Sequence, residues 1–372
     1  MKAAFVLTAH IPTDERVFYH QKLALEQRGC EVHIISTKTE RQIDSGFHCF
    51  NDKNLPKKKV IERIGQLLLE IEPEIIICDT PISVLGANYY RRKSKSKSRI
   101  FYDITEFYPS KKNIEGLSLF MRIIKYMVLL LLNFYADLKV DGFIFGEYYK
   151  SKPYRYIFPF KPFVFLPYYP DLNFLRQYPV NKIEKECHLL YCGNLTRDKG
   201  YDKVLEVARL VAIKHPEVHF ILTIINYTKS TFILERFPDN LEIKFSPFKP
   251  FPDFCNIIGN YDIYLDLRKI TRENNRCLPI KIFYYMNCGR AIIFSNLKAI
   301  RHDLPEATQF GFLVNPKDAN SIVNNISQYI TNGNLYDKHC KRALELSSDK
   351  YHWDSIKNGF VDFVLKDEHH KS

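Results

Sequence analysis

The segment LPIKIFYYMNCGRAIIFSN, residues 278–296, combines the marks of a short helix and of a buried strand. Pro279 stands near the expected helix start, Gly289 is placed to end the helix, and residues 291–294 form a short apolar run. A helix that leads into a buried apolar strand is the repeating step of a parallel α/β sheet. The segment therefore predicts an α/β fold, built from a series of such steps.

The same alternation of apolar runs and helical stretches continues through almost the whole chain. Strands are predicted at 3–8, 31–36, 74–79, 100–104, 142–145 and 163–167, and again at 188–192, 218–223, 241–245, 263–267, 291–294 and 311–314. Helices are predicted at 14–29, with Asp14 as N-cap and Gly29 as C-cap, at 201–214, 279–288 and 319–331, and in the tail that carries Trp353.

A chain of 372 residues is too long for one ordinary core, and the Pro- and Tyr-rich stretch 146–186 predicts a connection between two lobes. The predicted fold class is α/β, with two doubly wound, Rossmann-like domains facing a cleft. The predicted domains are 1–168 and 187–345. A closing helical segment, 346–372, is expected to pack back on the first domain.

The charge balance predicts anionic partners. The net charge is +12, and six of the positive residues lie in RRKSKSKSR, residues 91–99. Aromatic residues are not interleaved with this run as in nucleic-acid modules, so no nucleic-acid partner is expected. An anionic membrane surface is expected instead, with a cytoplasmic, peripheral location. The apolar stretch 127–136 is too short to span a bilayer and is either a core helix or an interfacial one.

Cysteine usage predicts a reducing compartment without a metal site. The nine cysteines are an odd number, contain no C-x-x-C pair and lie mostly in apolar runs. They are expected to be small buried side chains. Neither a metal nor a cofactor is predicted.

Three loops that follow predicted strands are candidates for ligand binding, because ligands of such sheets lie at the carboxyl ends of strands. The loop CGNLTRDKG, residues 192–200, offers backbone amides with Arg197 and Lys199 for a diphosphate. The loop RENNRCLPIK, residues 272–281, ends where the amides of Ile280 and Lys281 are free to meet an anion. In YDITEFYP, residues 102–109, Glu106 is a general base, a ligand of a sugar hydroxyl or a structural helix cap.

Six segments in register resemble the retaining GT-B glycosyltransferases of family 4, the group 1 glycosyltransferases. They cover about 350 residues. Residues 10–32 resemble H-x-x-x-D-x-R-x-F followed by a helix, and 102–109 resemble Y-D-x-H-E-x-x-P. The others are 165–172 with I-P-N-x-P-D, 191–200 with the donor phosphate loop, 278–296 with L-P-x-K-x-F-E-Y-M-x-x-G-x-P-V-I, and 311–322 with G-x-x-V-x-P-x-D-x-x-x-I.

The resemblance implies metal-independent transfer of a sugar, with retention, from a nucleotide sugar to a glycan or lipid-linked acceptor in surface polysaccharide synthesis. It implies donor phosphates near Gly193, Lys199 and residues 279–281, and an acceptor near His10, Asp14 and Arg16. The candidate catalytic carboxylates are Glu106 and Asp14.

The donor site departs from the family pattern at several positions. Asn194 stands where an Arg is frequent, and Thr105 stands where many members have His. Both carboxylates of the E-x7-E pair are replaced, by Arg276 and Tyr284. Arg197 and Glu273 are candidates to replace the lost contacts. Two alternatives stay open: a degenerate, non-catalytic glycosyltransferase-like partner subunit, and another two-Rossmann enzyme such as a sugar-nucleotide epimerase or a phosphorylase-like protein.

Overall fold

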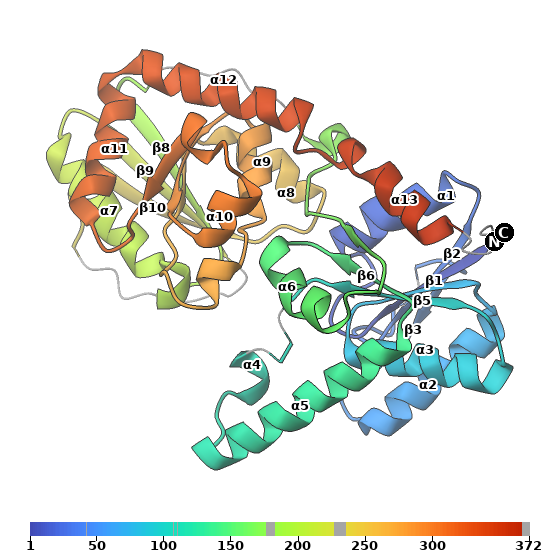
Figure 1. The fold of residues 1–372 in the computed structure, drawn as a ribbon. Coiled ribbons are helices and arrows are strands. Elements are labelled where there is room, and N and C mark those ends of the chain that lie inside the picture. The colour runs from blue at the N-terminus through green and yellow to red at the C-terminus, as the bar shows by residue number, and fades with distance from the viewer. Residues whose placement is uncertain (42, 107, 110, 176–182, 227–235, 367–372) are drawn as a thin grey trace. The chain divides into compact units, whose positions relative to one another are not determined.

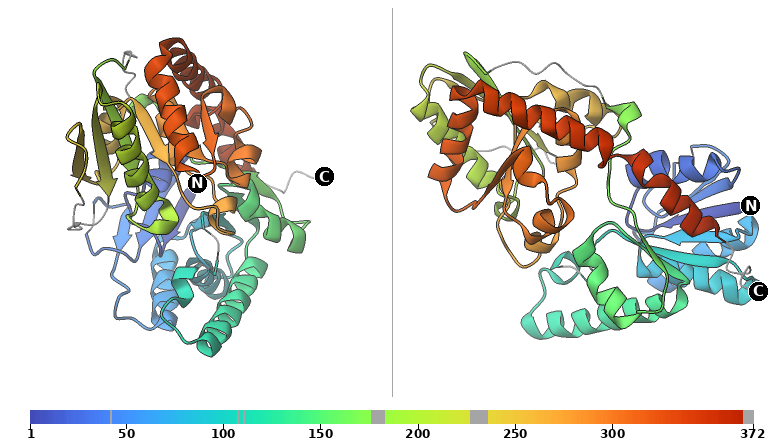
Figure 2. Two further views of the ribbon diagram at one scale, coloured as in Figure 1. Left: turned by 90° about the vertical axis from the view of Figure 1, so that its left-hand side faces the viewer. Right: turned by 45° about the horizontal axis from the view of Figure 1, so that its top comes forward.

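The computed structural model describes residues 1–372 except 42, 107, 110, 176–182, 227–235 and 367–372. The chain forms two compact units, Met1–Pro167 together with Ile356–Ser372, and Tyr168–Ser355 (Figure 1). Each unit holds one parallel sheet with helices packed on its two faces (Figures 1 and 2). The predicted class, α/β with two doubly wound domains, is confirmed.

Unit 1 contains a seven-stranded sheet in the order β3-β2-β1-β4-β5-β6-β7, and every strand pair is parallel. Its strands are β1 (Lys2–Leu7), β2 (Glu31–Ser36), β3 (Phe47–Cys49), β4 (Ile75–Cys78), β5 (Arg99–Ile104), β6 (Gly142–Phe145) and β7 (Phe163–Phe165). Its helices are η1 (Glu15–Lys22), α1 (Leu23–Glu26), α2 (Lys57–Ile71), α3 (Pro81–Ser94), α4 (Lys111–Ile114), α5 (Leu119–Lys139), α6 (Tyr148–Ile157) and α13 (Lys357–Leu365).

The helices of unit 1 form where apolar spacing and capping residues favour them. In α2, Val60, Ile64, Leu68 and Ile71 recur on one face and are buried in the core. Helix α3 begins with a capping box, in which the Thr80 side chain accepts from the Ser83 N–H, and Pro81 occupies its first turn. These helices pack against β1, β4 and β5 and fix the carboxyl ends of these strands.

Unit 2 contains a six-stranded parallel sheet in the order β10-β9-β8-β11-β12-β13. Its strands are β8 (Glu186–Cys192), β9 (His219–Asn226), β10 (Leu241–Pro247), β11 (Ile263–Asp266), β12 (Ala291–Ser295) and β13 (Gly311–Val314). Its longer helices are α7 (Tyr201–Lys214), α8 (Asp253–Ile257), α9 (Lys281–Asn287), α10 (Lys298–Asp303), α11 (Ala319–Thr331) and α12 (Gly333–Asp349). Short 3-10 turns are η2 (Leu172–Phe174), η3 (Arg197–Lys199), η4 (Ile258–Asn260), η5 (Asn274–Arg276), η6 (Ala307–Gln309) and η7 (Trp353–Ser355).

Several elements differ from the predictions. The helix predicted at 14–29 is a π-helix, Glu15–Lys22, followed by one turn of α-helix, although its predicted cap is confirmed because Asp14 accepts from the Arg16 N–H at 3.1 Å. The short edge strand β3 and the long helix α12 were not predicted. The predicted connection begins too early, because α6 and β7 belong to unit 1. The predicted closing segment starts at 346, inside α12, whereas Ile356 is the first residue of the tail that lies with unit 1.

Candidate functional site

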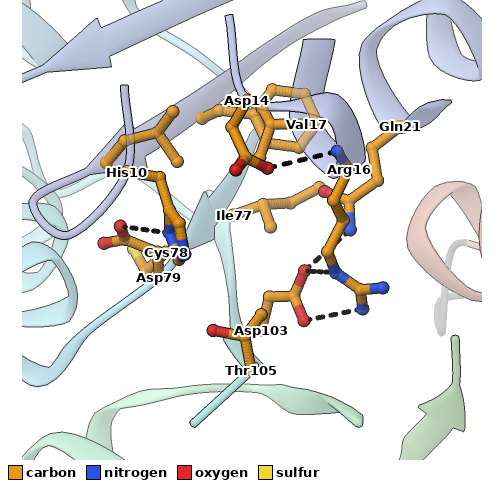
Figure 3. Close-up of a pocket in the computed structure, with 12 residues that line it drawn as sticks. His10, Asp14, Arg16, Val17, Gln21, Ile77, Cys78, Asp79, Asp103 and Thr105 are labelled. Carbon is orange, nitrogen blue, oxygen red and sulfur yellow. Dashed lines mark hydrogen bonds and ion pairs between the residues drawn. The ribbon is translucent and has the colours of Figure 1, made fainter. Parts of the chain in front are cut away.

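Four of the predicted residues meet in one small cavity of unit 1, of about 10 Å³ (Figure 3). His10, Asp14, Arg16 and Thr105 line it, and Asp79 and Asp103 join them from the carboxyl ends of β4 and β5. The cavity therefore lies at the edge of the parallel sheet where ligands of such folds bind.

His10 is held by Asp79, which follows β4. The Asp79 carboxylate accepts from the N–H groups of Thr8 and Ala9, both at 2.9 Å, and lies 3.2 Å from His10 Nδ1. Burial by itself would lower the pKa of His10, but the hydrogen bond to Asp79 and the nearby carboxylates of Asp14 and Asp103 raise this pKa to about 9. The imidazole is therefore a cation at neutral pH and suits a negatively charged or hydroxyl-bearing ligand.

Asp14 stands at the start of the π-helix, beside His10. Burial raises the pKa of its carboxyl above the ordinary value, against the opposing charges of His10 and Arg16. A carboxyl with a raised pKa exchanges protons more readily near neutral pH, as a general base requires. π-helical turns also occur frequently at functional sites.

Arg16 is occupied by partners within unit 1. Its guanidinium donates to both oxygens of Asp103, at 2.8 and 2.9 Å, and to the carbonyl of Leu166 at 2.7 Å. Gln21 Nε2 donates to the same carboxylate at 2.7 Å, and Arg16 is only 4% exposed. The arginine fixes the end of β5 and the residues after β7, so its effect on an acceptor is exerted through the positions of its neighbours.

Glu106 and Thr105 follow β5 but differ in exposure. Thr105 is buried, and its carbonyl accepts from Lys150 Nζ, which also pairs with Glu147 at 2.7 Å. Glu106 is exposed, and its carboxylate has no partner among the residues that the structure describes. Residue 110, directly before the next helix, lies outside the described residues, so the general base, the ligand of a sugar hydroxyl and the helix cap all stay predictions for Glu106.

In unit 2 the loop 193–200, here called the β8 loop, runs from β8 through η3 to α7. The Thr196 side chain accepts from the Lys199 N–H at 3.4 Å, and Tyr191 Oη donates to the Asn194 carbonyl at 2.7 Å. Gly200 has φ +80°, and a Cβ there would lie 2.0 Å from the Leu267 carbonyl oxygen. Only glycine therefore fits where the β8 loop crosses the loop after β11. Gly193, Asn194 and Arg197 are at least partly exposed on the β8 loop.

Positive charge gathers around the end of β8. Lys199 Nζ lies 3.4 Å from Asn274 Oδ1, and its pKa is lowered by burial and by the nearby guanidinium of Arg268. Arg268 is paired with both oxygens of Asp266, each at 2.6 Å, so this guanidinium is fixed in place. Asn274 donates to the carbonyls of Asp198 and Lys269 and so holds the β8 loop against the loop after β11.

Lys281 opens α9 and lies near the end of β8. Burial raises the pKa of the Cys192 thiol, and the charge of Lys281 opposes that rise, which places the ammonium close to the last residue of the strand. Its Nζ has no hydrogen-bond partner within the part of the chain that the structure describes. Ile280 and Glu273 are exposed, and the Glu273 carboxylate is near enough to Lys199 to favour its charged form.

The two substituted positions of the family pattern have different surroundings. Arg276 is exposed at the end of η5. Tyr284 is 4% exposed and meets Phe254 edge-on at a centroid distance of 6.1 Å. The ring is thus packed inward in this structure, and its predicted role at the donor stays a prediction.

Unit 2 also contains a hollow of about 980 Å³ at the carboxyl ends of β11, β12 and β13. It shares Gly200 with the β8 loop but is lined by none of the predicted donor residues. Its lining includes four cations, Lys203, Lys269, Arg301 and Lys317.

Sequence reasoning missed three residues that organise these sites: Asp79, Arg268 and Asn274. The signal for Asp79 was its place directly after a buried strand, in ICDT, residues 77–80, where a polar residue at a strand end faces the ligand edge. Arg268 and Asn274 lie in a loop whose course depends on tertiary contacts, so no local pattern marks them. Within the described ranges, no three His, Cys, Asp or Glu side chains are grouped as metal ligands would be.

Comparisons with known proteins agree with this arrangement. Residues 186–332 match the sequence family described as "Glycosyl transferases group 1". Comparison of the whole sequence with curated proteins gave no significant match.

Solved structures resemble the chain over nearly its full length. A sucrose-phosphate synthase from Thermosynechococcus elongatus matches with a TM-score of 0.68 at 14% identity, over 97% of both chains. WaaG, a glycosyltransferase involved in lipopolysaccharide biosynthesis, matches with 0.67 at 11% identity, over 98% of this chain and 100% of its own. HepE of Anabaena, in complex with UDP and glucose, matches with 0.67 at 12% identity, over 97% and 98%. The chain thus has the GT-B fold, and residues 186–332, within its second unit, match the group 1 glycosyltransferase family.

Proposed function

We propose that the protein transfers a sugar from a nucleotide sugar to a glycan or lipid-linked acceptor in the synthesis of a surface polysaccharide. The observation that carries the proposal is the gathering of Lys199, Arg268 and Lys281 around the end of β8, inside the matched domain. Such cations form a site for a diphosphate, although the N–H groups of Gly193, Thr196, Lys199 and Gly200 in the β8 loop are bonded within the protein. The binding of UDP by HepE supports a nucleotide donor.

In this transfer the bond from the anomeric carbon to the donor diphosphate breaks, and a bond to the acceptor oxygen forms. The leaving diphosphate carries away the electron pair and is stabilised by the three cations. The proton of the acceptor hydroxyl passes to a base, for which Glu106 and Asp14 are the candidates because one is exposed and the other has a raised pKa. Retention, membership of family 4 and transfer without a metal ion rest on the sequence resemblance.

We further propose that the enzyme works in the cytoplasm, at the inner face of a membrane. Of the basic run 91–99, Arg92, Lys93, Lys95 and Lys97 are exposed, whereas Arg91 and Arg99 are held by partners within unit 1. Exposed Lys and Arg near anionic lipid contribute about 1 kcal/mol each.

Lys199→Ala tests the donor site. A charge-assisted contact contributes roughly 1.5–3 kcal/mol, so binding of the preferred nucleoside diphosphate should weaken about tenfold or more. Isothermal calorimetry measures the affinity, after a thermal-shift screen has identified the nucleotide. Lys214→Ala is the matched control, because Lys214 is exposed on α7 of the same unit and bonds only Asn324. Equal nucleotide affinity of the Lys199→Ala variant and the wild type would show that the donor does not bind at the β8 loop.

A degenerate, non-catalytic subunit is the second candidate function. The replacement of both E-x7-E carboxylates, by Arg276 and Tyr284, favours it. A protein of this kind would bind no nucleotide sugar in the same screen and would co-purify with an active transferase.

A further inference from the structure

Helix α5 presents an apolar face that the fold of unit 1 does not cover. The helix is 21 residues long, and its length and hydropathy would suit a membrane span, yet only 11% of its most apolar window is buried. In Figure 1 its first half projects away from the sheet of unit 1. At 100° per residue, ten residues with exposed fractions between 41% and 72% share one side of the helix. They are Phe120, Met121, Ile123, Ile124, Met127, Val128, Leu131, Phe134, Tyr135 and Leu138.

The other side of α5 carries the cations Arg122 and Lys125 and the residues packed against unit 1, and the exposed side chains of Leu119, Tyr126 and Leu130 lie at the border between the two sides. Arg122 and Lys125 precede the buried residues Asn133 and Ala136 by eleven positions, or three turns, and therefore lie on the same side as these residues. An apolar face backed by a face with Lys and Arg is the pattern of a helix that lies in the plane of a membrane interface.

The C-terminal half of α5 is tied to unit 1, which excludes a span. Asn133 Nδ2 donates to Tyr154 Oη of α6 at 3.3 Å, and Lys161 Nζ donates to the carbonyl of Val140, directly after α5, at 2.6 Å. Arg91 Nη2 donates to the carbonyl of Lys139 at 2.6 Å, and the chain then enters strand β6. Only residues 119–132 project, and 14 residues of helix cover about 21 Å, less than the ~30 Å of a bilayer core.

A second segment extends the apolar face. Tyr156, Ile157 and Phe160 are exposed by 89%, 53% and 98%. Tyr156 and Ile157 end α6, and Phe160 lies in the loop between α6 and β7. The ring of Phe158, in the same segment, stacks on Phe134 of α5 at 5.6 Å. Aromatic residues next to cations are typical of the membrane–water interface. The two segments together, residues 119–138 and 156–160, are here called the α5 surface.

Charge decides between a membrane and a second copy of the chain as the occupant. Residues 116–136 contain no Asp or Glu. The exposed cations of 92–97 lie in the last turn of α3 and directly after it, and Arg91 of the same turn contacts the last turn of α5. A pair of copies joined through the α5 surface would bring these like charges together, whereas anionic lipid neutralises them. The occupant is therefore an anionic bilayer.

We infer that the α5 surface lies in the plane of an anionic membrane leaflet, inserted on its apolar side, and that the acceptor is consequently lipid-linked. The chain leaves the carboxyl end of β5 through Thr105 and Glu106 and reaches Leu119 after residues 107–118, so the chain connects the projecting half of α5 to the sheet edge that carries the candidate acceptor residues. A membrane that holds α5 keeps this edge near its surface. The acceptor part of this inference rests on the proposed function, whereas the membrane part does not.

Flotation with vesicles of phosphatidylcholine, with and without phosphatidylglycerol, tests the membrane part without donor or acceptor. Ile124→Glu/Leu131→Glu should lower the partition coefficient on anionic vesicles at least about tenfold. The control Leu55→Glu/Ile213→Glu adds the same charge at exposed apolar positions outside the α5 surface and should bind like the wild type. Phe160→Glu should also weaken vesicle binding. Because Phe160 lies in a loop, this variant tests the α5 surface without a change in α5 itself.

Depth measurements distinguish an in-plane helix from an inserted end. Phe120→Trp and Leu138→Trp should be quenched by brominated lipids at the same depth, whereas a transverse helix would separate them by about 27 Å. Equal vesicle binding of all the glutamate variants would overturn the inference. So would a wild-type dimer that Ile124→Glu/Leu131→Glu converts to monomer. If the wild type binds vesicles but transfers no sugar, the result would count against the proposed function instead.

Discussion

Replacing Asp79 by asparagine should return the pKa of His10 from about 9 towards its ordinary value of 6.5. Asp79 supplies the hydrogen bond and the largest opposing charge that outweigh the burial of the imidazole. The carboxylates of Asp14 and Asp103 also face His10, so part of the rise in its pKa should remain in the variant. The charge of Arg16 is offset by its ion pair with Asp103. An asparagine still offers one oxygen to the N–H groups of Thr8 and Ala9, so the local backbone should be retained.

The magnitude follows from the size of the shift. A rise of about 2.5 pKa units corresponds to roughly 3 kcal/mol of preference for the protonated imidazole in the folded state. Since the folded pKa is above the unfolded one, this stabilisation is fully present below pH 6.5 and is lost as the pH rises through about 9. Most of this pH dependence should disappear in Asp79→Asn.

NMR titration of the histidine Cε1 protons measures the pKa, and denaturant unfolding at several pH values measures the stability. His10→Gln assigns the resonance. Asp52→Asn is the matched control, because Asp52 pairs with Lys38 and Lys57 in the same unit, without contact to His10. A His10 pKa near 6.5 in the wild type, or one that is unchanged by Asp79→Asn, would refute the reasoning.

Three further changes have defined outcomes. Gly200→Ala should lower the free energy of unfolding by about 1–3 kcal/mol, because of the 2.0 Å approach to Leu267, and Gly29→Ala, with similar φ but open space, should cost less in the same denaturant series. Arg16→Met should cost about 3–5 kcal/mol by leaving the Asp103 carboxylate buried and unpaired, while Arg28→Met, at a half-exposed pair, should stay within about 0.5 kcal/mol. Tyr284→Glu should change the ranking of nucleotide sugars in a turnover assay, while Tyr284→Phe keeps it, and an unchanged ranking in both would place Tyr284 outside the donor site.

Most of the sheet could be predicted because its strands are buried on both faces. Residues 142–145 and 311–314 are short apolar runs between turn residues, and the structure gives these strands the same bounds. Helix α12 was missed although the sequence carries its signal: Asn332 caps its start, and its buried residues recur at helical spacing, at positions 336, 339, 340, 343, 346 and 347. The π-helix after Asp14 is set by packing, since no residue pattern distinguishes it from an α-helix.

The candidate site could be predicted only as a set of strand ends. Sequence placed His10, Asp14, Arg16 and Thr105 on two separate loops, and the structure brings them to one cavity. The pairing of Arg16 with Asp103 spans 87 positions and depends on the neighbouring places of β1, β4 and β5 in the sheet. The exposure of α5 could not be predicted either, because a buried core helix and a membrane-bound helix share the same composition.

Transfer of a labelled sugar to a lipid extract in the presence of anionic vesicles tests the central claim most directly. The wild type should move the sugar from one class of nucleotide sugar into the lipid fraction. Lys199→Ala should reduce the rate at least about tenfold, whereas Lys214→Ala should not. Failure of the wild type to bind or turn over any nucleotide sugar, with a competent lipid extract present, would contradict the claim and favour a non-catalytic subunit.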